Sequence, residues 1–125
     1  VPEIFELVRF HITSGNDIVA TATVDLRTGD TTVQEAACGD GPIDALYKTI
    51  DRITGISNKL EEYTIKAVTS GQDALGEVIV KITDGRRTYT GRGVRTDIIE
   101  ASAEAYINAL NKLAYEQQLW MEWGK

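Results

Sequence analysis

The sequence repeats one order of elements, and this duplication is the feature that most constrains its fold. In each half, three segments with the alternating pattern of strands precede one segment with helical periodicity. A Gly-x-Gly sequence stands between the third strand and the helix in both halves, starting at Gly39 and at Gly91. This internal duplication predicts two β-β-β-α units, over about residues 4–55 and 59–116.

The first half predicts three strands and a helix. Apolar and polar residues alternate over residues 8–13, 20–26 and 31–38, with turn-forming residues between these runs. Pro42 suits the first turn of a helix, and Gly55 marks the end of that helix. The apolar stripe of the helix consists of Ile43, Leu46, Tyr47, Ile50 and Ile53.

The second half predicts the same order. Strands are expected over residues 60–69, 75–83 and 86–90, with a turn at residues 70–73. Asp84-Gly85 predicts a two-residue hairpin loop.

The second helix is expected after Thr96 and Asp97, whose side chains offer N-capping oxygens. Its apolar stripe is Ile99, Ala103, Tyr106, Leu110 and Leu113, with a second flank at Ile98, Ala101 and Ala105. The chain ends on an apolar segment that contains Trp120 and Trp123. That segment either extends the last helix over a neighbouring subunit or frays.

The two units favour an α+β fold with antiparallel sheets and helices packed on one face. One helix covers at most one face of a three-stranded sheet, so neither unit closes a core by itself. The units should therefore pack together, or across a two-fold axis, in a single domain of 125 residues. Short edge strands are natural places for subunits to meet, and we expect a homodimer.

Composition excludes several classes of protein. Hydrophobic residues make up 42% of the chain and charged residues 26%, which is typical of a globular domain. No apolar run approaches the roughly 18 residues of a membrane-spanning helix. A net charge of -6 opposes binding to nucleic acid or to anionic membranes. The first residues show no basic leader before an apolar stretch, which predicts a cytoplasmic protein.

Catalytic and metal chemistry have few candidate residues. Cys38 is the single cysteine and His11 the single histidine, which leaves a metal site almost no ligands. No serine has a histidine base within a plausible triad. Glu61 and Glu62 are adjacent on a strand and point to opposite faces, so they cannot share one proton site. We therefore expect no catalytic residue, metal or cofactor in this chain.

The Gly-x-Gly sequences are candidate anion-binding turns. Small residues at a helix start let backbone N–H groups face a carboxylate or a phosphate. Alternatively, these glycines only turn a strand into a helix. Neither sequence continues into a Walker motif or a dinucleotide fingerprint, so phosphoryl transfer is not expected.

Seven segments carry a resemblance to a known family. They are Ser14-Gly15-Asn16-Asp17, Ala20-Thr21-Ala22-Thr23-Val24, Gly39-Asp40-Gly41-Pro42-Ile43-Asp44-Ala45, Asp73-Ala74-Leu75-Gly76-Glu77-Val78, Gly91-Arg92-Gly93-Val94, Thr96-Asp97-Ile98-Ile99-Glu100-Ala101-Ser102 and Ala105-Tyr106. In this order they resemble the regulatory domain of the 2-isopropylmalate synthase family, from about residue 5 to residue 113. The family's enzymes condense acetyl-CoA with 2-oxoisovalerate in leucine synthesis, in a TIM barrel that holds a divalent metal and precedes this domain. That barrel is absent here, so the resemblance implies a regulatory fragment with no acyltransferase activity of its own.

The resemblance also implies a leucine site between the two units, near the dimer axis. In this family, polar groups at the helix starts hold the carboxylate and ammonium groups of leucine. Carried over, the apolar pocket consists of Ile43, Leu60, Tyr63, Ala67, Ala74 and Ile98, with Gly76 leaving room. The head group would meet Gly39, Gly41, Asp44, Thr96 and Asp97. Helix N-termini suit a carboxylate and aspartates suit an ammonium, so the residue chemistry agrees. Leucine bound there would mediate feedback inhibition of the missing barrel.

Three other functions stay open at this point. The equivalent domain of citramalate synthase resembles this fold and responds to isoleucine, although Ile43 favours a leucine-type pocket because an aromatic residue there would indicate isoleucine. A small α+β enzyme with a site at the Gly-x-Gly turns would show turnover. A module that only dimerises would bind no amino acid.

Overall fold

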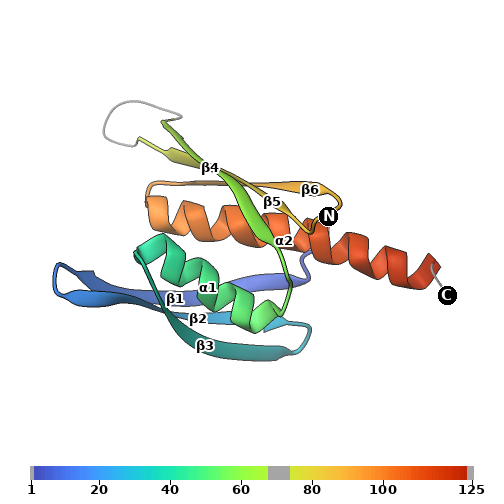
Figure 1. Ribbon diagram of the computed structural model, residues 1–125, viewed down its shortest axis with the longest axis horizontal. Coiled ribbons are helices and arrows are strands. Elements are labelled where there is room, and N and C mark those ends of the chain that lie inside the picture. Colours follow the sequence, from blue (N-terminus) through green and yellow to red (C-terminus); the bar gives the residue numbers. More distant parts are fainter. Residues whose placement is uncertain (1, 68–73, 124–125) are drawn as a thin grey trace. The chain divides into compact units, whose positions relative to one another are not determined.

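The computed structural model describes residues 2–67 and 74–123 of the chain (Figure 1). Its elements follow the order β1 (Phe5–Gly15), β2 (Ile18–Thr28), β3 (Thr31–Gly39), α1 (Pro42–Thr54), β4 (Lys59–Ala67), β5 (Gly76–Thr83), β6 (Thr88–Arg95) and α2 (Ile98–Trp123). The predicted α+β fold, with two antiparallel sheets each followed by a helix, is confirmed. The predicted turn at residues 70–73 and the last two residues of the predicted strand 60–69 lie outside the described residues.

The chain divides into two compact units. The first is Phe5–Gly55, and the second starts at Ile56 and includes the short N-terminal segment that ends at Ile4. No helix in the described ranges is long and apolar enough to cross a membrane.

The first unit is the sheet β1-β2-β3 covered on one face by α1. Alternate residues of the central strand β2 are buried because they face the helix: Ala20, Ala22, Val24 and Leu26. The buried Thr49 hydroxyl of α1 lies 3.1 Å from the Ala22 carbonyl oxygen, which ties the helix to this strand. Both predicted helix signals are confirmed, since Pro42 begins α1 and Gly55 ends it in the left-handed conformation with φ 66°.

The second unit is the sheet β4-β5-β6, and α2 packs on β5 and β6. Figure 1 shows α2 running beneath this sheet. Val78, Val80 and Ile82 of the central strand β5 are fully buried on the helix side. Among the described residues, β4 pairs only with β5 and is an edge strand of this sheet.

The helix α2 is longer and more deeply buried than a single amphipathic stripe predicts. Most positions from 101 to 114 are buried, and they fall on more than one face of the helix. The predicted stripe is buried except at Ile99, and the second flank except at Ile98, both of which are half-buried. The helix continues to Trp123, so the apolar C-terminal segment extends it.

The structure corrects the prediction for Gly91-Arg92-Gly93, which is not a turn. Both glycines lie inside β6 and are buried. A Cβ added at Gly91 would overlap the Ala105 carbonyl oxygen, and one added at Gly93 would overlap that of Ala101. These glycines are therefore spacers that let the α2 backbone approach the strand.

The loop before β6 is also longer than predicted. The strands pair up to Thr83 and Thr88, so four residues form the loop and β6 starts later than residue 86. The Asp84 carboxylate stabilises this longer loop because its Oδ1 accepts the N–H groups of Arg86 and Arg87, each at 2.9 Å. Gly85 supplies the positive φ of 95°.

A row of α2 side chains covers the outer edge of β6. Glu104 Oε1 accepts the Val94 N–H at 3.1 Å, Asn108 Nδ2 donates to the Arg92 carbonyl at 2.8 Å, and Lys112 Nζ donates to the Thr90 carbonyl at 2.6 Å. Four helix residues rise about 6 Å and two strand residues about 6.6 Å, so every fourth side chain meets every second strand residue. We call Glu104, Asn108 and Lys112 the edge row, because they satisfy backbone groups that an edge strand otherwise leaves open.

Candidate functional site

Four predicted site residues gather at the start of α1 in the first unit. Gly41 is the N-cap residue, with extended backbone, and it offers no side-chain oxygen to the first-turn N–H groups. A Cβ added at Gly39 would lie 2.7 Å from both the Ala45 Cα and Asp44 Oδ2, so Gly39 brings the end of β3 against this turn. Ile43 is half-buried in the same turn. The uncapped N–H groups suit a carboxylate.

The carboxylate of Asp44 is already bonded within the protein. Its Oδ2 accepts the Asp40 N–H at 2.8 Å and lies 2.9 Å from Lys48 Nζ. The Asp40 N–H, and then Lys48, hold the pKa of Asp44 below its usual value of 3.8, so the group is ionised at neutral pH. Asp44 raises the pKa of Lys48 in return. A ligand ammonium group at this position would share the carboxylate with Lys48.

Four predicted apolar residues gather on the helix side of the second sheet, near the start of α2. Ala67 and Gly76 are paired across β4 and β5. A Cβ added at Gly76 would overlap the end of the Ile98 side chain, so Ile98 fills the space above this glycine. The Tyr63 hydroxyl lies 2.5 Å from the Oγ of Ser102, one helical turn beyond Ile98. Tyr63, Ala67, Gly76 and Ile98 therefore line one stretch of this unit.

The predicted polar residues of the second unit stand at the same helix start. Asp97 caps α2, because its Oδ1 accepts the Ile99 N–H at 2.8 Å, as predicted. Thr96 precedes it and is exposed. An exposed aspartate here can meet an ammonium group while it also caps the helix.

Leu60 lies apart from this cluster, at the other end of the same strand. It pairs with Ile82, and Ala67 pairs with Gly76. These partners are six residues apart on β5, and a strand rises about 3.3 Å per residue, which puts Leu60 about 20 Å from Ala67, further than one leucine reaches. Ala74 is exposed just before β5.

The strand β4 presents an apolar strip that α2 does not cover. Leu60 is 40% exposed and Ile65 50% exposed, although their cross-strand partners Ile82 and Val78 are fully buried on the helix side. Because paired residues share a face, both side chains face the helix side beyond the edge of α2. Ile65 was not predicted as a site residue. The sequence pattern that could have identified it is the strand alternation that it shares with Tyr63 and Ala67.

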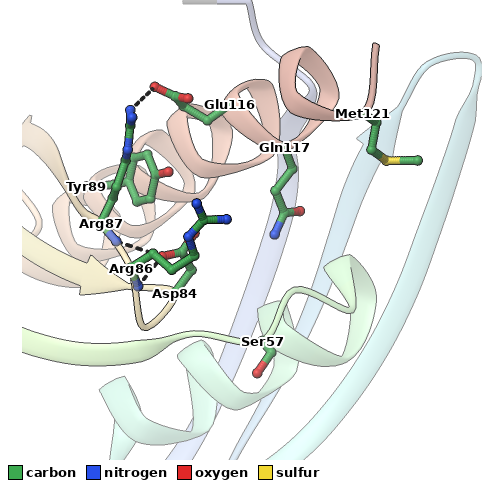
Figure 2. A pocket seen from close by; sticks show the side chains of 8 residues that line it. All are labelled: Ser57, Asp84, Arg86, Arg87, Tyr89, Glu116, Gln117 and Met121. Carbon is green, nitrogen blue, oxygen red and sulfur yellow. Dashed lines mark hydrogen bonds and ion pairs between the residues drawn. The ribbon is translucent and has the colours of Figure 1, made fainter. Parts of the chain in front are cut away.

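A pocket of about 460 Å³ lies elsewhere in the second unit (Figure 2). It lies between the loop after β5 and the C-terminal part of α2, and it shares no residue with the predicted site. Its lining is Ser57, Asp84, Arg86, Arg87, Tyr89, Glu116, Gln117 and Met121. Arg87 Nη1 lies 3.1 Å from Glu116 Oε1, and Asp84 accepts two backbone N–H groups, so these charges are bonded within the protein. Burial, and then the charges of Asp84 and Glu116, raise the pKa of Tyr89.

Comparison with known proteins places the chain in a family. Residues 1–114 match the LeuA allosteric (dimerisation) domain. The chain is 55% identical over 119 residues to a 2-isopropylmalate synthase of Carboxydothermus hydrogenoformans, which covers 94% of this chain and 23% of that protein. It is 50% identical over 119 residues to that of Pelotomaculum thermopropionicum, with 94% and 24% covered, and 54% identical over 115 residues to that of Heliobacterium modesticaldum, with 92% and 22% covered. The chain thus spans about a quarter of the length of these relatives. It belongs to the family of LeuA allosteric (dimerisation) domains.

Proposed function

We propose that this chain is the leucine-binding regulatory domain of a 2-isopropylmalate synthase. The observation that carries the proposal is the family match over residues 1–114, together with relatives of that name at 50–55% identity. The relatives are about four times longer than this chain, which leaves room for a catalytic domain with its divalent metal in the same protein. Leucine bound here would inhibit that domain, in the cytoplasm, and the chain alone would catalyse no condensation.

The residues proposed to bind leucine include those at the start of each helix. The uncapped first turn of α1 suits the carboxylate of leucine, and Asp44 and Asp97 suit its ammonium group. Tyr63, Ala67, Gly76 and Ile98 supply an apolar wall for the side chain. The other proposed residues are Gly39, Gly41, Ile43, Leu60, Ala74 and Thr96.

A comparison of binding free energies shows why the polar groups of the proposed site matter for leucine affinity. Burial of a leucine side chain contributes about 1.5–3 kcal/mol, whereas micromolar affinity needs about 8 kcal/mol. The charged head group must therefore supply much of the difference.

The proposed domain acts as a homodimer. The family is one of dimerisation domains, and the apolar strip of β4 gives a second copy a surface to cover. Leucine would favour one arrangement of the units, and a coupling of about 1–3 kcal/mol is typical of allosteric inhibition.

The structure weakens the alternative of a small enzyme at the Gly-x-Gly turns. Gly91 and Gly93 are buried within β6, so the second of these turns does not exist.

Calorimetry with leucine, isoleucine, valine and acetyl-CoA tests the proposal directly. We expect leucine to bind most tightly and to raise the Tm, since a ligand stabilises the state that it binds. Tighter binding of isoleucine than of leucine would favour the regulatory domain of a citramalate synthase instead. No binding of any of these amino acids would leave a module that only dimerises.

A further inference from the structure

Ser102 connects the two secondary-structure elements that carry the apolar cluster. Its side chain is fully buried in α2, and its Oγ lies 2.8 Å from the carbonyl oxygen of Ile98, one turn earlier. The same Oγ lies 2.5 Å from the hydroxyl of Tyr63 on β4. Ser102 thus touches a helix residue and a strand residue of the cluster at once.

The direction of the two hydrogen bonds follows from the number of protons. A serine hydroxyl has one hydrogen. Ser102 donates it to the Ile98 carbonyl, which can only accept. The Tyr63 hydroxyl therefore donates its own hydrogen to Ser102.

This bond fixes an aromatic ring on a strand that is otherwise loosely covered. Tyr63 stands on the edge strand β4, where its neighbours Leu60 and Ile65 are 40% and 50% exposed. Its backbone is held by pairing with Val80, and its hydroxyl is held by α2. Without the second contact, the ring would have to be ordered when a ligand binds, at a cost in conformational entropy.

We propose that Ser102 is a positioning residue of the leucine site. It holds the Tyr63 ring against the start of α2 as a preformed apolar wall. It also accepts the hydrogen of the Tyr63 hydroxyl, so that the leucine side chain meets the aromatic ring and not a hydrogen-bond donor. This inference rests on the proposed function, because that proposal assigns Tyr63 to the leucine pocket.

A double-mutant cycle of leucine affinity, measured by calorimetry on the 125-residue chain, tests the inference. Ser102→Ala removes the acceptor, and Tyr63→Phe removes the hydroxyl but keeps the ring. We expect each single variant to bind leucine about 2- to 10-fold more weakly, which corresponds to one ordinary hydrogen bond. The double variant should bind no more weakly than the weaker single variant, because both changes remove the same contact.

Tyr106→Phe is the matched control. The Tyr106 hydroxyl also joins α2 to the rest of this unit, because it donates to Asn58 Oδ1 at 3.1 Å, but neither residue belongs to the predicted site. Its loss should lower the Tm and leave leucine affinity unchanged.

The outcomes separate the two proposals. If the wild-type chain does not bind leucine, the proposed function and this inference both fail. If the wild type binds leucine and folded Ser102→Ala binds it equally well, only the inference is overturned. The same holds if Ser102→Ala weakens leucine binding as much in the Tyr63→Phe variant as in the wild type. If Ser102→Ala does not fold, Tyr63→Phe tests the inference, since it leaves the hydrogen bond of Ser102 to Ile98 in place. Unchanged leucine affinity in Tyr63→Phe would overturn the inference.

Discussion

Gly91 of β6 passes so close to Ala105 of α2 that no side chain fits between the two backbones. A Cβ at Gly91 would overlap the Ala105 carbonyl oxygen and lie 2.6 Å from the Ala109 nitrogen. Both neighbours are helix backbone, which cannot rotate out of the way as a side chain can. The glycine therefore sets the distance between this strand and its helix.

Gly91→Ala should lower the free energy of unfolding by about 1–3 kcal/mol, the usual cost of overpacking a core. Gly15→Ala is the control, because a Cβ there would meet only Ile18 side-chain atoms at 3.6–4.0 Å. Its effect should stay within about 0.5 kcal/mol. Urea unfolding of both variants measures the difference, and equal stabilities would contradict this account of β6.

The sequence predicted the elements well but gave the two Gly-x-Gly sequences the same role. Pro42 after Gly41 is a local helix-start signal, and α1 begins there. Val94 and Arg95 follow Gly93 instead and belong to the strand, which ends at Arg95, and the Asp97 cap stands two residues later. What packs over a glycine is a tertiary property, so the spacer role of Gly91 has no local signature.

The sequence indicated which candidate residues lie close together where these residues are also neighbours in sequence. Gly39 and Asp44 meet because one short turn holds both, and Asp97 caps the residue two positions later. Leu60 and Ala67 were predicted to line one pocket, and they share a face of β4. They lie far apart, however, because the chain between them is an extended strand. Ser102 was missed because a small helix residue carries no pattern that reveals its partner on another strand.

Asp97→Ala should cost about 1 kcal/mol of stability through loss of the α2 cap. Asp97→Asn separates cap from charge, because asparagine caps about as well and carries no charge. If the carboxylate meets the ammonium group of leucine, both variants should bind leucine more weakly, while only Asp97→Ala unfolds more readily. Wild-type leucine affinity in Asp97→Asn would remove Asp97 from the binding site and leave it a capping residue.

Acid should weaken the α1 start through Asp44. The pKa of this carboxyl is lowered in the folded state, so its contribution is complete above the usual value of 3.8 and is lost as the pH falls through the folded pKa. The difference in unfolding free energy between wild type and Asp44→Asn should therefore be steady near neutral pH and shrink below about pH 4. Lys48→Ala should retain much of the acid dependence, because the Asp40 N–H is the larger cause. Urea unfolding from pH 3 to pH 7 tests this, and a difference that is constant to pH 3 would contradict it.

Removal of the edge row should open β6 to pairing with another chain. Replacement of Glu104, Asn108 and Lys112 together by alanine leaves the Val94 N–H and the Arg92 and Thr90 carbonyls without these partners. Exposed strand edges promote association. We expect this variant to form larger species than the wild type in sedimentation experiments. Alanine at Glu100, Gln117 and Gln118, which are exposed on α2, is the control and should leave the size unchanged.

Ala67→Phe tests the apolar wall of the proposed leucine pocket. Ala67 ends β4, faces the helix side with Tyr63 and pairs with Gly76, over which Ile98 packs. A phenylalanine ring there would occupy the space proposed for the leucine side chain. Because Ala67 is exposed in this chain, the change should cost little stability while leucine binding is lost.

Lys66→Phe is the control for the added ring, because the neighbouring residue on a strand points to the opposite face of the sheet. Lys66 is exposed, and its replacement should keep both fold and leucine affinity. Calorimetry at matched concentrations, with circular dichroism to show that each variant is folded, gives the comparison. Leucine affinity equal to wild type in folded Ala67→Phe would show that the pocket is not at this end of β4. The pocket would then be expected at the Leu60 end of the same apolar strip, and Leu60→Ala would have to weaken leucine binding.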